Sequence, residues 1–571
     1  MTKFIVVVGG VISGVGKGVS TASIGKILQK YGYSVTAIKI DPYMNCDAGT
    51  LRPTEHGEVW VTDDGGEIDQ DLGNYERFLG QDILKQNNIT TGQVYKTVIE
   101  KERKGEYLGK TVMIIPHIPN EIKKRIFEAS EGFDFCVIEI GGTIGDYENF
   151  PFLFATKSLE RELGKENVLH ILVTYLLVPR HMNEMKTKPT QQAIKLLNEA
   201  AGIFPDLILC RGPFPLDDIR RRKIETSANI PAEDIISEPD IDTIYRVPLD
   251  LEKENIGLKI LKKCKLFPKA NPSWYKWEKL VNNIVGPEKK VKVAMVGKYV
   301  DVGNFTLEDS YVSVNQAIQH AGANSNAKVE ITWIDAKSLE TNPEKLEELR
   351  NYDGVIIPGG FGTSGIEGKI ATSKFVRENN IPFLGLCLGM QCALADIGRN
   401  IANLENANTI EKDPNTPHPV IMILPSQVQH MKEGNYGATM RLGGFAAILK
   451  EGSKTLQLYK ETGRLQEDQN KLGKLPRERT GLSNDTNTVI ERHRHRFEVN
   501  PKYVEALEAA GVIFSGHHKR EDGAKLMEFI ELPNHKYFLA TQAHPEFKSR
   551  LDNPAPLFFG FIQACLNSKD F

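Results

Sequence analysis

Short apolar runs recur along the first part of the chain, and longer polar stretches separate them. KFIVVVGG begins at Lys3, VTAIKI spans residues 35–40, and further runs begin at Asp134, Leu169 and Asp206. Continuous apolar runs of this length are typical of strands that are covered on both faces of a sheet. Residues 16–31 predict a helix between the first two strands. We therefore predict an α/β domain built on a mostly parallel sheet with helices on both faces.

The pattern breaks between residues 264 and 290, where prolines and mixed charge indicate a linker with a short helix. A second series then follows, with the strands VKVAMVGK, VEITWID, DGVIIPGG and PFLGLCLG and a helix that ends near His320. We predict two doubly wound α/β domains, over residues 1–267 and 291–571, joined by a linker over 268–290. Residues 461–487 are rich in Lys, Arg, Glu, Gln, Gly and Asn, which predicts a mobile surface insertion.

Composition narrows the class of protein. The 571 residues are 40% apolar and 25% charged, with a formal net charge of -3, as in an ordinary globular protein. The near-zero charge argues against a nucleic-acid-coating protein but leaves small anionic substrates open. The apolar runs are too short to span a bilayer, and the N-terminus lacks a signal-peptide pattern. Seven widely spaced cysteines without a CxxC pair indicate a reducing compartment. We expect a cytoplasmic protein that binds neither nucleic acid nor membrane.

A glycine-rich turn, GGVISGVGKGVST, follows the first strand and leads into a helix. Free backbone N–H groups and the positive end of the helix dipole make such a turn a phosphate site, with Lys17 as the counter-charge. The spacing departs from the usual P-loop, because five residues separate Gly10 from Gly16 and Gly18 stands where Ser or Thr usually binds magnesium. A plain glycine turn between strand and helix is the alternative.

Two acidic residues are candidate ligands for the magnesium ion that a triphosphate brings. Glu139 lies inside an apolar strand, where a carboxylate needs a cation or a donor to offset its desolvation. Asp71 begins the segment DLGNYERF and, taken by itself, is better explained as a solvated loop carboxylate. The segment KTKPTQ at 186–191 offers ammonium and hydroxyl groups for a second phosphate chain, with a solvated basic loop as its alternative.

The second domain carries a candidate nucleophile. Cys387 lies in GLCLG between a strand and a helix, the G-x-C-x-G form of a nucleophile elbow, and the helix N-terminus favours its thiolate. A cysteine in an apolar stretch is more often a core residue, as Cys392 illustrates. His544 and Glu546 in HPEF supply a base and its orienting carboxylate, and the amides of PGGFG at 358–362 could form an oxyanion hole. A thiol protease and a glutaminase both fit this set.

Taken together, the motifs resemble those of the CTP synthase family, in the family's order along nearly the whole chain. They are GGVISGVGKG, KIDPYMN, HGEV, DLGNYERF, EIGGTIGD, KTKPTQ, PGGFG, GLCLGMQ, ENAN, MRLG, ERHRHRFEVN and HPEF. The resemblance implies a P-loop-like amidoligase domain followed by a flavodoxin-like class I glutaminase domain. It implies a ligase that converts UTP to CTP with ATP, Mg²⁺ and glutamine or free ammonia, as the last step of de novo CTP synthesis.

The resemblance also implies roles for individual residues. ATP would contact Gly14, Val15, Gly16, Lys17, Gly18, Val19, Lys39, Asp71, Arg211, Pro239, Asp240 and Ile241. UTP, or CTP as feedback inhibitor, would contact Ser13, Asp146, Tyr147, Glu148, Lys186, Thr187, Lys188, Pro189, Thr190, Gln191 and Lys223. Magnesium would bind Asp71 and Glu139, and His56 would line the ammonia entry. Catalysis would use Cys387, His544 and Glu546, and glutamine would contact Gly360, Leu388, Gly389, Met390, Gln391, Glu411 and Arg496.

The family resemblance further implies activation by GTP and assembly into homotetramers, as dimers of dimers, and filaments. The sequence departs from the family in three places. Ser364 replaces an arginine linked to GTP activation, Asn183 precedes Glu184 in the lead-in to KTKPTQ, and residues 461–487 are an insertion. We therefore expect weaker or differently built control by GTP and altered affinity for UTP.

Two other functions compete with this one. A different P-loop ligase with a glutaminase tail, amidating a cofactor carboxylate, would share both halves, and a substrate panel of UTP against dicarboxylates separates them. A catalytically silent protein that binds nucleotides and polymerises is the rival from another class. The intact Lys17, Glu139 and Cys387 argue against silence.

Overall fold

The computed structural model describes residues 1–51, 57–181, 184–298, 301–302, 305–306, 308–424, 427, 439–483 and 485–568. Its contacts divide the chain into two compact units. The first unit comprises residues 1–48 and 68–281, and the second comprises residues 49–67 and 282–571. The short segment 49–67 therefore leaves the first unit and packs with the second, which the apolar pattern did not indicate.

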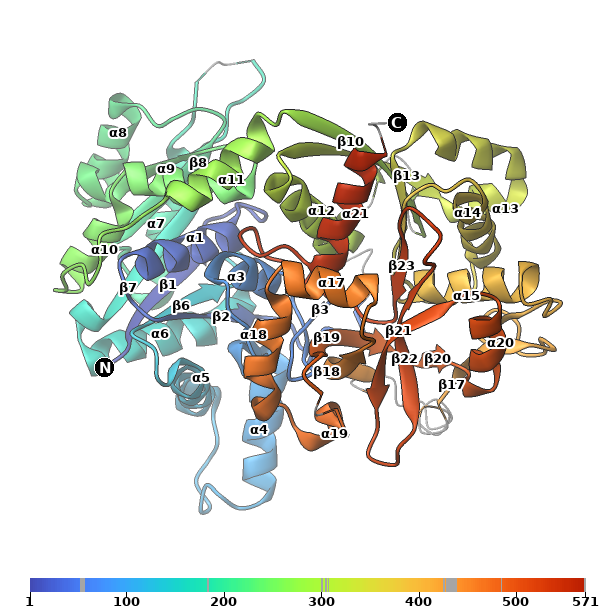
Figure 1. Cartoon of the computed structure of the whole chain (residues 1–571). Coiled ribbons are helices and arrows are strands. Elements are labelled where there is room, and N and C mark those ends of the chain that lie inside the picture. The colour runs from blue at the N-terminus through green and yellow to red at the C-terminus, as the bar shows by residue number, and fades with distance from the viewer. Residues whose placement is uncertain are drawn as a thin grey trace. The chain divides into compact units, whose positions relative to one another are not determined.

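The first unit is built on a parallel sheet, as predicted (Figure 1). Over the described residues its strand order is β5-β2-β6-β1-β7-β8-β9, and each neighbouring pair is parallel. The strands are β1 (Lys3–Gly9), β2 (Val35–Asp41), β5 (Asn88–Thr90), β6 (Phe135–Ile140), β7 (Val168–Tyr175), β8 (Leu207–Gly212) and β9 (Ile235–Pro239). Because the strands are parallel, all of their carboxyl ends lie along one edge, where ligands of open α/β sheets bind.

Helices cover both faces of this sheet. On one face, a first group of helices packs its apolar side chains against alternate strand residues such as Val6, Ile138 and Leu172. On the other face, α1 packs against β2 and β6 and contacts α3, α9 and α10. The first group is α4 (Thr91–Arg103), α5 (Ile114–Ser130), α6 (Phe150–Leu163), α7 (Lys188–Ala201) and α8 (Asp218–Ala228). The others are α1 (Lys17–Lys30), α3 (Asp71–Leu79), α9 (Val247–Lys253), α10 (Ile256–Lys263) and α11 (Tyr275–Val285). The unit is thus doubly wound.

The second unit contains a larger, mixed sheet. Among the described residues its order is β13-β10-β14-β15-β23-β22-β21-β18-β19. The first five strands in this order are parallel, and the rest are antiparallel. They are β10 (Lys289–Gly297), β13 (Ala327–Asp335), β14 (Gly354–Ile357), β15 (Phe383–Leu386), β18 (Arg441–Leu449), β19 (Thr488–His495), β21 (Ile513–Lys519), β22 (Lys525–Glu531) and β23 (Phe538–Thr541).

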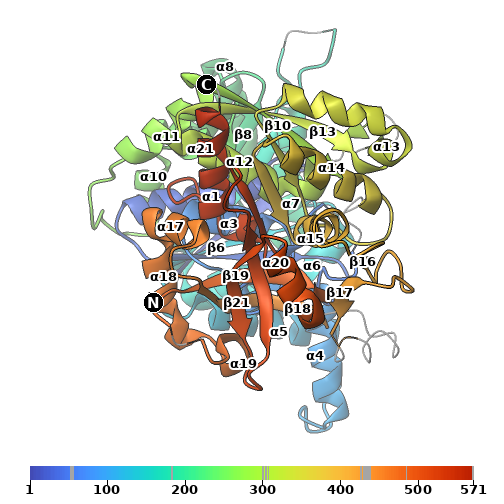
Figure 2. The same cartoon turned by 45° about the vertical axis from the view of Figure 1, so that its right-hand side comes forward.

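Two apolar cores lie on opposite faces of this sheet. One packs under α13 (Ala336–Thr341), α14 (Ile366–Glu378), α15 (Leu388–Asn400) and α20 (Val504–Ala509). The other packs under α12 (Val312–Asn324), α17 (Lys454–Glu461) and α21 (Pro556–Asn567). The turned view in Figure 2 shows α14 and α15 apart from α17 and α21. The second unit is therefore also an α/β layered fold.

Smaller elements complete the chain. Short sheets pair β3 (Trp60–Val61) with β4 (Glu67–Ile68), β11 (Asp301–Val302) with β12 (Phe305–Thr306), and β16 (Asn408–Thr409) and β20 (Phe497–Val499) with β17 (Pro419–Ile423). The helix η10 (Pro545–Lys548) follows β23. No helix among the described residues has the length and apolar character that crossing a membrane needs.

The segment predicted as a mobile insertion contains ordered structure instead. It includes α18 (Arg464–Lys471) and α19 (Arg477–Thr480), and Asp468 of α18 is fully buried. The Asp468 carboxylate pairs with Lys548 Nζ at 2.8 Å and accepts the Ile490 backbone N–H at 3.0 Å. The prediction was wrong because it counted only apolar side chains as a source of order, whereas this helix is anchored by a buried ion pair.

We expect Asp468→Ala to lower the free energy of unfolding by roughly 3–5 kcal/mol, because it leaves the Lys548 ammonium buried without its partner. Urea unfolding monitored by circular dichroism measures this change. The exposed pair between Arg350 and Glu347 provides the control, since Glu347→Ala should cost less than about 1 kcal/mol. Equal losses in the two variants would show that the buried pair does not anchor α18.

Candidate functional site

The first group of predicted residues gathers at the carboxyl edge of the parallel sheet. The loop after β1 ends at Gly16, which adopts a left-handed backbone (φ 81°) and caps the N-terminus of α1. Lys17 is the first residue of that helix, and its Nζ donates to the carbonyl of Gly142, in the loop after β6, at 2.7 Å. The loop thus has free N–H groups at a helix N-terminus and a lysine beside them, as a phosphate site requires.

Gly18 and Asp71 explain the departure from the usual P-loop spacing. A Cβ atom at Gly18 would collide with the carboxylate of Asp71, so no serine or threonine fits there. Asp71 is the first residue of α3 and supplies an oxygen close to where a P-loop hydroxyl would lie. The carboxylate therefore replaces the hydroxyl as a candidate magnesium ligand.

Lys39 lies between the two candidate metal ligands. Its Nζ contacts the Asp71 carboxylate and bonds Glu139 Oε1 at 2.9 Å, while the Tyr75 hydroxyl donates to the other oxygen of Glu139. Burial disfavours the charged lysine, but the negative charges of Asp71 and Glu139 outweigh it and raise the pKa of Lys39. Burial raises the pKa of Glu139, with Lys39 opposing it. The ammonium shows that a cation is stable at this point.

Over the described residues, no group of three or more His, Cys, Asp or Glu side chains is arranged to hold a metal ion alone. A magnesium ion that accompanies a nucleotide does not need one, since phosphates and water complete its six ligands. The oxygen donors Asp71 and Glu139 therefore fit such an ion. Burial lowers the pKa of Lys17, which also lies beside these groups.

Arg211 joins the phosphate loop to the segment predicted to hold adenine. Its Nη1 donates to the Val15 carbonyl at 3.0 Å, and its Nη2 lies 3.5 Å from Asp240 Oδ1. Pro239, Asp240 and Ile241 line a cavity of about 350 Å³ at the end of β9. The cavity and the loop are thus connected through one arginine.

The predicted UTP residues occupy the same edge but are more exposed. Lys186 pairs with Glu184 at 2.9 Å, Thr187 accepts from Gln191 Nε2 at 3.2 Å, and Lys188 and Pro189 begin α7. Thr190 is buried and bonds the Thr174 hydroxyl at 3.0 Å, so it anchors α7 to β7. The remaining residues are exposed (Ser13, Tyr147, Glu148, Lys223) or close their own loop, as Asp146 does by accepting the Thr143 N–H at 2.5 Å. Asn183 lies outside the described residues.

In the second unit, Cys387 stands at the sharp turn between β15 and α15. Its backbone has φ 50° and ψ -102°, a strained conformation for a residue with a side chain. Neighbouring glycines allow this turn, because a Cβ at Gly389 would collide with the Ile357 carbonyl and one at Gly385 would lie 2.9 Å from the Ala540 Cβ. The amide of Gln542 points at the Cys387 sulfur, with 3.4 Å between nitrogen and sulfur.

His544 and Glu546 form a buried pair just after β23. His544 Nδ1 and Glu546 Oε1 are 2.7 Å apart, and the carboxylate is 2% exposed. Burial favours the neutral imidazole, but the charges of Glu546 and Cys387 outweigh it and raise the pKa of His544 to about 10. His544 Nε2 makes no hydrogen bond of normal geometry, although Cys387 is close enough to affect its charge. The pair therefore favours the imidazolium form of His544.

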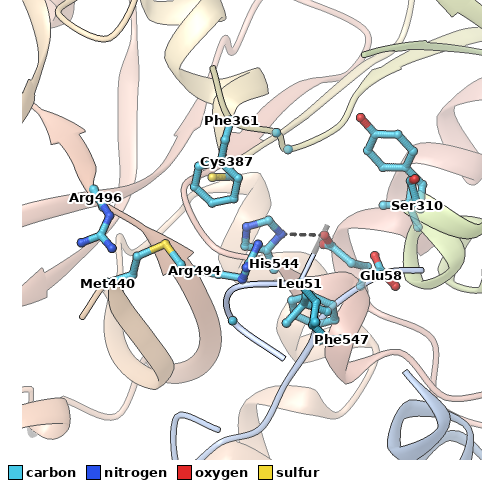
Figure 3. Close-up of a pocket in the computed structure, with 17 residues that line it drawn as sticks. Leu51, Glu58, Ser310, Phe361, Cys387, Met440, Arg494, Arg496, His544 and Phe547 are labelled. Atoms are coloured by element: carbon cyan, nitrogen blue, oxygen red, sulfur yellow. Dashed lines mark hydrogen bonds and ion pairs between the residues drawn. The ribbon is translucent and has the colours of Figure 1, made fainter. Parts of the chain in front are cut away.

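A cavity of about 390 Å³ opens beside these residues (Figure 3). Of the predicted residues, Gly360, Cys387, Arg496, His544 and Glu546 line it. Arg496 bonds Gln427 Oε1 at 2.7 Å and Thr439 Oγ1 at 2.9 Å. Figure 3 shows Cys387 and His544 close together near the centre of the view and Arg496 at its left. The cavity thus combines a nucleophile, a base and a cation.

Other predicted glutamine contacts lie beside the cavity and do not line it. Met390 is buried in the core under α15, and Gln391 bonds Gln542 at 3.2 Å. Leu388 and Gly389 form the first turn of α15, where helix N–H groups have no partner within the helix. Glu411 accepts the Gly362 N–H at 2.7 Å, and burial raises its pKa. His56, the predicted ammonia entry, lies outside the described residues.

Several lining residues were missed by the sequence reasoning. They include Leu51, Glu58, Val59, Ser310, Tyr311, Met440 and Arg494. The motifs HGEV and ERHRHRFEVN contain three of them and were noted only for His56 and Arg496. The available signal was the short spacing between the two arginines, because Arg494, at the end of β19, and Arg496, in the bend after it, both line the cavity.

Two lysines hold the PGGFG loop from behind the cavity. Lys369 Nζ donates to the Pro358 carbonyl at 3.2 Å, and Lys298 Nζ donates to the carbonyls of Phe361 (3.2 Å) and Gly362. In a trans peptide the N–H points away from the C=O, so a held Pro358 carbonyl turns the Gly359 N–H the other way. Lys369 is fully buried, and burial lowers its pKa to about 8.

Comparisons with known proteins agree with this arrangement. Residues 3–266 match the family model described as the CTP synthase N-terminus, and residues 306–564 match glutamine amidotransferase class-I. The CTP synthase of Methanocaldococcus jannaschii is 48% identical over 99% of both chains, and that of Pyrococcus abyssi is 47% identical over 100% of this chain and 99% of its own. A solved glutaminase domain of Trypanosoma brucei CTPS with bound acivicin is 32% identical, covering 48% of this chain and 94% of its own, with a TM-score of 0.40.

A P-loop-like parallel-sheet unit joined to a class I glutaminase unit defines a glutamine-dependent ligase that forms carbon–nitrogen bonds. One half matches the CTP synthase N-terminus model, the other matches the class I glutamine amidotransferase model, and the curated CTP synthases match over nearly the full length. The chain belongs to the CTP synthase family.

We expect Lys369→Met to make the protein more stable at pH 7, because it removes a buried charge at similar side-chain volume. The unfolded chain keeps this lysine protonated up to its usual pKa of 10.5, whereas the folded protein releases the proton near pH 8. The stability of the wild type therefore rises between about pH 8 and 10.5, and the advantage of the variant shrinks over the same window.

Urea unfolding at several pH values measures this difference. Lys374→Met, at an exposed position of the same helix, is the control and should leave the pH dependence of stability unchanged. A constant gap between Lys369→Met and the wild type from pH 7 to pH 10 would contradict the prediction.

Proposed function

We propose that the chain catalyses the ATP-dependent amination of UTP at the uracil 4-position, giving CTP, with ammonia from glutamine or from solution. One observation carries the proposal: a strained cysteine beside a His–Glu pair in one unit is joined to a lysine-bearing phosphate loop in the other. The names of the full-length relatives support the identity of the product. A lone glutaminase or a lone nucleotide-binding protein would need only one of these sites.

The geometry of the second unit supports glutamine hydrolysis. The Cys387 thiolate would attack the side-chain amide carbon of glutamine, and the oxygen charge would be met by the Gly360 N–H and the free N–H groups that begin α15. The His544 imidazolium would give its proton to the departing nitrogen, which leaves as ammonia. Water, deprotonated by His544, would then cleave the thioester and release glutamate. Glu546 keeps Nδ1 protonated and so directs Nε2 at the reacting atoms.

Recognition of glutamine would use two charges at the cavity. Arg496 lines it, and its guanidinium matches the α-carboxylate of an amino acid. Glu411, held by the Gly362 N–H, would meet the α-ammonium. These two groups favour a free amino acid over a peptide, which supports a glutaminase and disfavours a thiol protease.

The first unit would activate the uracil oxygen. The residues from Gly14 to Val19 and Lys39 would hold the ATP phosphates, and Arg211 with the cavity at residues 239–241 would hold the base. Magnesium bound with ATP would be held by Asp71 and Glu139 and would neutralise phosphate charge. Lys186 to Gln191, Ser13 and Lys223 would bind UTP. Transfer of the γ-phosphoryl group to the uracil 4-oxygen makes it a leaving group, which ammonia displaces.

Regulation and assembly complete the proposal. CTP would inhibit by binding with its triphosphate in place of that of UTP, and Asp146, Tyr147 and Glu148 would contact it. GTP would activate glutamine hydrolysis, although the loop that usually carries an arginine has exposed Ser364 here. Association into a homotetramer and filaments is supported by exposed apolar side chains such as Leu108, Met113 and Ile114.

We expect Cys387→Ala to abolish CTP formation from glutamine while leaving CTP formation from ammonia within about twofold, because the variant removes only the nucleophile of the hydrolysis. The measurement is the absorbance change on conversion of UTP to CTP, with glutamine and with an ammonium salt, each with and without GTP. Loss of both activities in a folded variant would overturn the two-site scheme.

Lys17→Met supplies the reciprocal control. It removes the cation of the phosphate loop, so both the glutamine-driven and the ammonia-driven reactions should fall by about 10²-fold or more. Glutamine hydrolysis assayed alone should continue. Retention of ammonia-driven CTP formation would mean that phosphate binding does not use this loop.

A further inference from the structure

Two aromatic rings, those of Phe547 and Trp60, form a contiguous cluster against the imidazole of His544. The Phe547 ring stacks on it, with ring centres 5.4 Å apart and planes 28° apart. The indole of Trp60 then meets Phe547 edge to face, at 5.1 Å and 68°. Trp60 is fully buried, and Phe547 is 3% exposed. Trp60 belongs to residues 57–67, called the strap below, which come from the N-terminal part of the sequence and pack in the second unit.

Arg492 of β19 binds both the strap and the catalytic loop. Its backbone carbonyl accepts the N–H of His544 at 2.8 Å. Its buried side chain bonds the Val61 carbonyl at 3.0 Å and the Phe547 carbonyl at 3.4 Å, and pairs with Asp63. The guanidinium also lies over the Trp60 ring, 5.4 Å from its centre. Arg492 thus holds both the backbone of His544 and the two aromatic rings, Phe547 and Trp60, that pack behind its imidazole.

The strap is fastened along its whole described length. Near its start, Glu58 accepts the N–H of Ser313 at 2.8 Å, and at its end Glu67 bonds Arg494 at 2.9 Å. In the middle, the Asp63 carbonyl accepts the Gly444 N–H at 2.9 Å and also binds Arg479, from α19. The indole is therefore held in place by polar contacts on both sides of it.

The hydrogen bond to Glu546 leaves one rotation of the imidazole open. A ring held only at Nδ1 can tilt about the line between Nδ1 and the carboxylate, which would move Nε2 away from the Cys387 sulfur. A ring stacked on one face blocks this tilt, since aromatic pairs have preferred geometries. Phe547 supplies the stack, and Trp60 stops Phe547 from moving back.

We propose that Trp60 is a positioning residue of the glutaminase reaction: through Phe547 it fixes the plane of His544 so that Nε2 stays directed at Cys387. The inference rests on the proposed roles of Cys387 and His544. It assigns part of the glutaminase site to residues 57–67, inside the segment that matches the CTP synthase N-terminus model. A chain that began at residue 291 would contain Cys387, His544 and Glu546 but would lack the strap and its Trp60 ring.

The test compares Trp60→Leu with Trp60→Phe in the full chain. Trp60→Leu fills much of the space but loses the aromatic edge, so kcat for glutamine hydrolysis should fall roughly tenfold with KM within about twofold. Trp60→Phe keeps an aromatic edge and should stay within about threefold of the wild type. Ammonia-driven CTP formation should be unchanged in both variants.

The pH profile separates positioning from a general loss of structure. The charged and titratable groups around His544 are Cys387, Glu546, Glu58 of the strap, and Arg492, His493, Arg494 and His495 of β19. A loosened imidazole is a poorer partner for Glu546, so the alkaline limb of kcat/KM for hydrolysis should move to lower pH in Trp60→Leu.

Trp277→Leu is the matched control, because Trp277 is a buried tryptophan of similar exposure in the other unit. It should lower stability without moving the alkaline limb. An unshifted limb in Trp60→Leu, or an equal loss of the ammonia-driven reaction, would show that Trp60 is merely structural and overturn the inference.

Phe547→Leu breaks the same stack from its other end and must reproduce the shift, which keeps the proposal testable if Trp60→Leu does not fold. A different result identifies failure of the underlying function: Cys387→Ala that still hydrolyses glutamine would show that the cysteine is not the nucleophile. In that case the proposed function fails, whatever the tryptophan variants do.

Discussion

The buried His544–Glu546 pair is the main electrostatic constraint on the second unit, because its charges must be compensated inside the protein. A carboxylate that is 2% exposed is tolerated only where charge or donors compensate it. The imidazolium beside it supplies that charge. The pKa of His544 is therefore raised to about 10, although burial alone would lower it. The stacked rings of Phe547 and Trp60 contribute to this burial by covering one face of the imidazole. Stability and reactivity therefore depend on the same burial.

The first unit solves the same problem with the signs reversed. There the buried cation is Lys39, and the carboxylates of Asp71 and Glu139 surround it. The parallel sheet makes this possible, because β2 and β6 are neighbours and bring Lys39 and Glu139 to the same register. A buried charge in an apolar strand needs an opposite charge or a hydrogen-bond donor or acceptor nearby, and here the adjacent strand supplies the opposite charge. The site is thus a property of strand order as much as of sequence motifs.

The sequence predicted the fold class and much of the site for physical reasons that can be named. Buried parallel strands are apolar on both faces, so β1, β2 and β6 were recognisable from composition alone. Strained turns need glycine neighbours, so Cys387 was recognisable from GLCLG. The order in α18 was missed because its anchor, Asp468 with Lys548, joins residues 80 positions apart. No local pattern distinguishes such a pair from two solvated charges.

The strap was missed for a related reason. The sequence HGEVWVTDD is typical of a short strand and turn. Only the tertiary structure shows that the Arg492 guanidinium lies over the Trp60 ring and pairs with the Asp63 carboxylate. Arg492 in turn was hidden in ERHRHRFEVN, where alternation along β19 places it on the same face as Arg494, and Arg496 follows in the bend after the strand. The three guanidinium groups of this segment are largely buried and must each find acceptors. Asp63 and Val61 satisfy the first, Glu67 the second, and Gln427 with Thr439 the third. Two of these three arginines therefore find acceptors in the strap, so residues from the N-terminal part of the sequence help to satisfy the buried guanidinium groups of the glutaminase unit.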